Sequence, residues 1–177
     1  VPHDEYVFGS GLTSDDYQAM WNVVAGGPGV VAIGEEEKVE GAATHVAVWT
    51  SPDGISWSRV PHDDTLFGFG TYRGDGKVIM RSIAAVDTGL VAVGGQGLFV
   101  VAEDASVATD IAVVWTSPDG VTWSRTANDD EILSWAEMTH VVAESDGLKA
   151  FGFAGREFWS PTLWEAFAGV AGSGVNN

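Results

Sequence analysis

The sequence WTSPDGISWSR at residues 49–59 returns as WTSPDGVTWSR at residues 115–125, an offset of 66 residues (115 − 49 = 66). The two copies differ at only two positions, where Ile55 and Ser56 of the first copy become Val and Thr in the second. Such a match indicates an internal repeat, and a repeat at this period is typical of stacked supersecondary units. The sequence therefore gives more information about architecture than about activity.

Each copy has the composition of a β-hairpin. The Ser-Pro-Asp-Gly segment favours a turn, because Pro presets φ, the Asp side chain can accept hydrogen bonds from nearby amides and Gly allows a positive φ. Trp49 precedes this turn and Trp57 follows it. We therefore predict a hairpin with one Trp on each arm, a pattern suited to packing against a neighbouring sheet.

The hairpin resembles the Asp-box, Ser-x-Asp-x-Gly-x-x-Trp, of sialidase-type (BNR) β-propeller repeats, shortened by one residue between Asp and Gly. In that family the box is a structural turn between the third and fourth strands of a blade, away from the catalytic centre. The resemblance implies a propeller fold more strongly than an activity. It also implies structural roles for Ser51, Asp53, Gly54, Trp57, Ser117, Asp119, Gly120 and Trp123.

Outside the box, the three methionines mark the same place in successive units. Met20, Met80 and Met138 each lie in a strand pattern that is followed by a Gly- or Asp-bearing turn and a second strand ending in Gly. The Trp hairpin supplies the third and fourth strands. Each unit is therefore expected to hold four short strands joined by turns, as one propeller blade does.

These units predict an all-β fold in a single domain of residues 1–177, with three four-stranded antiparallel β-propeller blades and a loose tail. The blades are expected at residues 1–59, 60–125 and 126–168, and the tail at 169–177. Three blades make an incomplete ring, since closed propellers have about four to eight. The expected partners are therefore further blades, from another copy of the chain or from a missing segment.

The third unit lacks the Asp-Gly pair of the box. The segment at residues 158–164 retains Trp159, Ser160, Pro161 and Trp164, which we interpret as the first Trp, the Ser-Pro pair and the second Trp of a box in a smaller, atypical terminal blade. The tail is rich in Gly, which is the reason for expecting it to be loose.

Composition limits the classes of partner. The chain has 25 acidic and 8 basic residues and a net charge of −17, which argues against binding nucleic acid or an anionic membrane surface. It has no Cys, which excludes disulfides and Cys-ligated metals, and no apolar run long enough to insert into a membrane. The chain begins at Val1 without Met, which suggests a processed or excised segment, and we expect an extracellular or cell-surface location.

The arginines do not form a recognisable catalytic set. Sialidases use an arginine cluster, a tyrosine nucleophile with a glutamate partner, and an acidic aspartate. Arg59 and Arg125 follow the two boxes at matching positions, so they are features of the repeat. The other arginines are Arg73, Arg81 and Arg156, which we interpret as surface charge.

The histidines give no clear metal signature either. His3 and His62 both lie in Pro-His-Asp, at equivalent places in different units, while His45 and His140 are isolated in the sequence. We therefore predict no metal and no cofactor.

Two functions from different classes remain. The first is a non-catalytic β-propeller repeat module that acts as a binding or assembly scaffold, with carbohydrate or protein as its ligand. The second is part of a divergent sialidase-like glycoside hydrolase. A ligand site is expected on the face of the longer loops, at residues 9–19, 35–44, 68–78 and 95–110.

Overall fold

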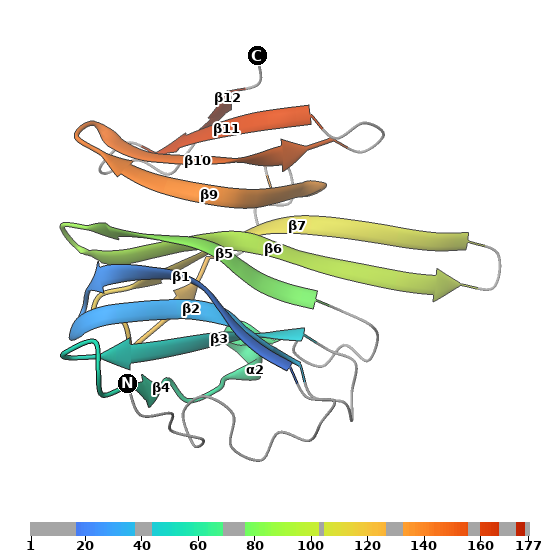
Figure 1. Cartoon of the computed structure of the whole chain (residues 1–177). Coiled ribbons are helices and arrows are strands. Elements are labelled where there is room, and N and C mark those ends of the chain that lie inside the picture. The colour runs from blue at the N-terminus through green and yellow to red at the C-terminus, as the bar shows by residue number, and fades with distance from the viewer. Residues whose placement is uncertain are drawn as a thin grey trace.

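Most of the chain that the structure describes is β-strand and very little is helix, so the all-β class is confirmed (Figure 1). The computed structural model describes residues 17–37, 44–68, 77–102, 105–126, 133–155, 160–166 and 173–175. Within these ranges the helix is α2 (Asp64–Phe67), which has only four residues. No helix in these segments has the length and apolar character that a membrane span requires.

The strands form three successive antiparallel groups, which we name units 1, 2 and 3. Unit 1 consists of β1 (Tyr17–Gly26), β2 (Gly29–Glu37), β3 (Thr44–Ser51) and β4 (Ser58–Arg59). Unit 2 consists of β5 (Lys77–Val86), β6 (Gly89–Ala102), β7 (Ala105–Ser117) and β8 (Ser124–Arg125). Unit 3 consists of β9 (Ala136–Glu144), β10 (Gly147–Ala154), β11 (Ser160–Ala166) and β12 (Ser173–Val175).

The three units are stacked, with unit 2 between unit 1 and unit 3 (Figure 1). A parallel bridge between Thr44 and Lys77 joins the first two units into one eight-stranded sheet, and unit 3 forms a separate four-stranded sheet. Each unit places its strands side by side in chain order. This order is what short turns between neighbouring antiparallel strands produce.

The first strand of every unit is bulged at the same point. Met20, Met80 and Met138 pair with Gly34, Gly94 and Gly152, and the register shifts by one residue directly after each methionine. A Cβ on any of these glycines would lie 1.8–1.9 Å from a backbone carbonyl oxygen of the bulged strand. Only glycine fits there, because the bulge brings the two backbones too close for a side chain.

The register also shows which tryptophans are equivalent. Trp49 pairs with Ala32, and Trp115 pairs with Ala92. In unit 3 the residue opposite Ala150 is Trp164. Our interpretation of the third box remnant was therefore wrong: Trp164 takes the place of the Trp before the turn, because the sheet register, rather than the Ser-Pro pair, fixes its position.

Two apolar clusters hold the stack together. The first joins unit 1 to unit 2 and includes Ile33 and Val48 on one side and Met80, Ile83 and Trp115 on the other. The second joins unit 2 to unit 3; its members are Ala84, Val93, Ala112, Leu133, Ala136, Met138, Val141, Ala150 and Trp164. Each unit thus presents one face with a Met and a Trp, which we call its methionine face, and an opposite face, which in units 1 and 2 carries smaller apolar side chains such as Ile33 and Val93.

Two further details differ from the sequence-based expectation. Residues 173–175 of the predicted loose tail form β12, which pairs with β11 from Leu163 to Glu165. Residues 95–102 and 105–110, which belong to an expected loop, continue β6 and β7 as a long antiparallel pair that projects from the stack (Figure 1). Both segments gain backbone hydrogen bonds from a neighbouring strand, an effect that composition alone does not reveal.

The bulge glycines give a test of the fold. Gly94→Ala should destabilise the chain by at least about 2 kcal/mol, because the added Cβ meets the backbone oxygen of Ile79 at 1.9 Å. Urea unfolding followed by tryptophan fluorescence measures the change. The matched control is Gly97→Ala, where the nearest atom is the side-chain oxygen of Asp110 at 3.0 Å, and here we expect a cost below about 1 kcal/mol. Equal costs for both variants would contradict this account.

Candidate functional site

The first box turn is held by its own side chains. Asp53 Oδ1 accepts hydrogen bonds from the backbone amides of Ile55 at 2.8 Å and Ser56 at 2.7 Å. Ser51 Oγ accepts from the amide of Gly54 at 2.8 Å, and Gly54 has a φ of 74°. These are the bonds of a rigid local turn.

The second box turn repeats this arrangement. Asp119 Oδ1 accepts from the amides of Val121 at 2.9 Å and Thr122 at 2.6 Å, and Ser117 Oγ accepts from the amide of Gly120 at 2.8 Å. The amides of Thr122 and, second, Val121 donate hydrogen bonds to the Asp119 carboxylate and lower its pKa below the ordinary value. Amide donation from Ser56 and Ile55 lowers the pKa of Asp53 in the same way. Both carboxylates are therefore engaged in shaping backbone.

The two tryptophans that follow the box turns, Trp57 and Trp123, differ in burial. Trp123 is buried, donates from Nε1 to the carbonyl of Gly120 at 3.0 Å, and contacts the ring of Phe67 at a centroid distance of 6.4 Å. Trp57 is only partly buried and packs with the cluster around Trp49. Trp123 is the more buried of the two because it lies in the cluster between units 1 and 2.

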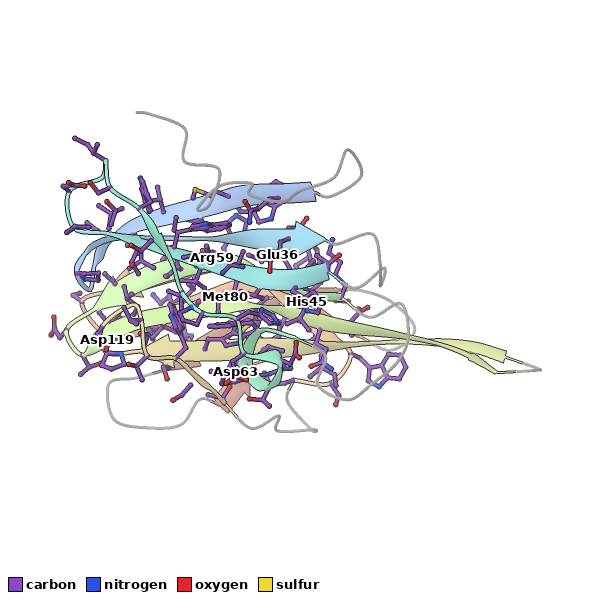
Figure 2. All side chains as sticks on the ribbon, turned by 90° about the horizontal axis from the view of Figure 1, so that it is seen from below. Glu36, His45, Arg59, Asp63, Met80 and Asp119 are labelled. Atoms are coloured by element: carbon purple, nitrogen blue, oxygen red, sulfur yellow. The ribbon has the colours of Figure 1, made fainter. Side chains whose placement is uncertain are left out.

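The box arginines cover the tryptophans before the turns. The Arg59 guanidinium lies 4.9 Å from the centre of the Trp49 ring and pairs with Glu36 at 3.1 Å (Figure 2). The Arg125 guanidinium lies 5.8 Å from the Trp115 ring, and burial lowers the pKa of Arg125. Both arginines therefore contribute cation–π contacts within their own units, as expected of features of the repeat.

A second charged group lies where units 2 and 3 meet. Arg81 Nε donates to Glu137 Oε1 at 2.8 Å. Burial, followed by repulsion from Glu137, raises the pKa of Asp110. Arg73 and Arg156 fall outside the described residues. Among the residues that are described, no tyrosine, acid and arginine cluster corresponds to a sialidase centre.

His45, His62 and Asp64 lie together in the structure, a grouping that the sequence did not predict. His62 Nε2 lies 2.8 Å from Asp64 Oδ1, and the rings of His45 and His62 meet edge to face with centroids 5.0 Å apart. His45 is therefore not isolated, since β3 carries it to the segment before α2. No sequence signal links His45 to His62, because the contact depends on the path of the chain between units 1 and 2.

Figure 2 places His45 and Asp119 at opposite ends of the strands. His45 lies at the start of β3, near Glu36, its partner in the β2–β3 register. The box turns follow the other end of β3 and of β7. The box turns and the histidine group therefore lie on different ends of the stack. Of the other histidines, His140 is exposed on β9, and His3 falls outside the described residues.

Among known proteins, a distant structural likeness is found. No protein-family model matches the chain, and no curated protein matches it. One similar solved structure is the crystal structure of a putative glycoside hydrolase from Parabacteroides distasonis, with 12% identity and a TM-score of 0.42. The match covers 89% of this chain and 50% of that chain, so this chain spans about half its length. A likeness this distant transfers neither a fold nor an activity.

The box carboxylates can be tested by stability. Asp119→Ala should lower the melting temperature by about 2–4 °C, the shift expected for loss of a local capping interaction in a chain of this size. The pKa of Asp119 is lowered from 3.8, so its contribution is present above that pH and disappears as the carboxylate becomes protonated below it. The difference between variant and parent should therefore shrink below pH 3.8.

Scanning calorimetry at pH 7 and at acid pH measures both effects. Asp87→Ala, which alters an exposed residue between β5 and β6, is the control and should leave the melting temperature within about 1 °C of the parent. Unchanged melting of Asp119→Ala would contradict the structural role of the box.

Proposed function

We propose that this chain is a non-catalytic segment of a β-propeller, related to sialidase-type repeats, whose units act as blades and whose outer faces bind further blades. Its role is that of an assembly scaffold with an extracellular or cell-surface location. The proposal rests on one comparison, which is the exposure of equivalent side chains in the three units. The four-stranded units, their common bulge and the two matching box turns support it.

The methionines carry this comparison. Met80 is fully buried against unit 1, and Met138 is 4% exposed against unit 2. Met20, at the same register position in unit 1, is 41% exposed, and Val23 beside it is 58% exposed. The methionine face is therefore covered in units 2 and 3, where a preceding unit packs on it.

The opposite face of unit 3 gives the complementary observation. Ile33 and Val93, at one register position in units 1 and 2, are buried beneath the following unit. Phe151 holds this position in unit 3 and is 42% exposed, and Val142 and Phe153 on the same unit are 41% and 40% exposed. An open face of each kind therefore remains, one at either end of the stack.

A repeat unit of the same kind is the occupant that suits these faces. Between units the chain packs a methionine face on an opposite face twice. In the proposed assembly the opposite face of unit 3, which carries Phe151 where units 1 and 2 have Ile33 and Val93, packs on the methionine face of unit 1 of another chain. Fully burying one such side chain contributes roughly 1.5–3 kcal/mol. Two chains joined in this way would form a ring of six units, within the usual range for propellers. A segment of a longer chain could supply the same faces.

The alternative, a part of a divergent glycoside hydrolase, is favoured by one observation. Burial, followed by repulsion from the nearby Glu137, raises the pKa of Asp110, and a carboxyl group with a raised pKa is what the general acid of glycoside hydrolysis requires. The ion pair of Glu137 with Arg81 gives this group a structural explanation as well, because it joins units 2 and 3.

The isolated 177-residue chain is predicted not to be a stable monomer. Light scattering at micromolar concentration should give a mass above 18.6 kDa. Met20→Asp with Val23→Asp should reduce this mass to that of one chain, because charges on the open methionine face oppose its burial. The control is Val121→Asp. Val121 is 49% exposed and lies in a box turn, so this variant should leave the assembly intact. A folded, monodisperse parent chain of 18.6 kDa would overturn the prediction.

No hydrolysis of glycosides is predicted for the purified chain. Fluorogenic sialosides and a panel of other aryl glycosides, tested at several pH values, measure this directly. Cleavage that Glu137→Gln or Asp110→Asn abolishes, in a variant that still melts like the parent, would replace the scaffold proposal with the hydrolase alternative. Cleavage that survives both substitutions would be assigned to a contaminant.

A further inference from the structure

We propose that His45, His62 and Asp64 form a binding site for a divalent transition metal ion, with Zn²⁺ as the ion of best fit. One donor atom from each residue lies within 4.8 Å of the other two. In a tetrahedral zinc site, donors at about 2.0–2.1 Å from the metal are about 3.3 Å apart. Small side-chain rotations are therefore enough to bring the three donors onto one ion.

The chemistry of the donors selects the class of metal. Two imidazole nitrogens and one carboxylate oxygen suit Zn²⁺ and its neighbours in the transition series, whereas Ca²⁺ and Mg²⁺ prefer oxygen donors. The His62 and Asp64 side chains are 31% and 69% exposed, so an ion can reach them from solvent. Three protein donors leave a fourth position for water.

The donors are held in place by packing. The His62 ring contacts the His45 ring at 5.0 Å and the Phe67 ring at 6.4 Å, and Phe67 is buried in the cluster between units 1 and 2. Asp64 lies in the first turn of α2, which Asp63 caps by accepting from the amide of Thr65 at 2.8 Å. A strand, a buried ring and a capped turn therefore hold the backbones of the three residues close together before any ion arrives, which lowers the entropic cost of binding.

A simpler explanation is a His62–Asp64 hydrogen bond with no metal, since Nε2 and Oδ1 are 2.8 Å apart. In that explanation the hydrogen bond involves His62 and Asp64 and does not require His45. In the metal site, the ion takes the place of the hydrogen bond between His62 and Asp64, and His45 is a third ligand of the same ion. The two explanations differ in whether His45 matters for binding.

The test is titration of the whole chain with Zn²⁺ by calorimetry, and with Co²⁺ by its visible absorption. The parent should bind one Zn²⁺ per chain at micromolar concentration, with a rise in melting temperature on addition of the ion. His45→Ala, His62→Ala and Asp64→Asn should each weaken binding by more than about tenfold, since even outer-shell changes cost about 10–100-fold. The melting temperature of each variant without metal shows whether it has folded.

The control is His140→Ala, because His140 is exposed on β9 and lies outside this group. It should bind Zn²⁺ like the parent. Absence of Zn²⁺ binding by the folded parent at submillimolar concentration would overturn the proposal. Binding that both folded variants His45→Ala and His62→Ala retain at parental affinity would also overturn it. Neither readout depends on the oligomeric state, so this test and the test of the scaffold can fail independently.

Discussion

The arrangement of this chain depends on the close approach of a bulged strand to a glycine. Without a bulge, alternate residues of β5 would share a face, and Met80 and Ile83 would point in opposite directions. The register shift after Met80 moves the alternation by one residue, so both side chains enter the cluster with unit 1. The shift requires Gly94, because a Cβ there would lie 1.9 Å from a carbonyl oxygen. The same constraint recurs at Gly34 and Gly152.

Once the bulge has set the faces, stacking follows from the size of the side chains. The methionine faces of units 2 and 3 carry bulky groups such as Trp115 and Trp164, and the faces that receive them carry Val, Ala and Ile. Large groups against small ones fill the space between sheets at the density of a protein interior. This complementarity runs in one direction along the chain, which is why the two ends of the stack expose different faces.

The two ends of the strands have different chemical characters. At one end, the box turns use their Asp and Ser side chains to satisfy backbone amides, as Asp53 and Asp119 do. These carboxylates have little capacity left for a ligand. At the other end, the passage from unit 1 to unit 2 brings His45, His62 and Asp64 together. The Asp and Ser side chains of the two repeated turns therefore stabilise the backbone. The residues with metal-binding side chains come together where unit 1 joins unit 2.

The sequence by itself determined the strand units, the box turns and the all-β class, because these depend on local turn chemistry and on a repeat of 66 residues. It also identified Met20, Met80 and Met138 as equivalent. Only the tertiary structure decided what is set by pairing and by contacts between units. Trp164 was assigned by its register with Ala150, and residues 173–175 became a strand by pairing with β11. The contact of His45 with His62 likewise joins residues that no pattern links, since β3 meets the segment between β4 and α2 only in the folded chain.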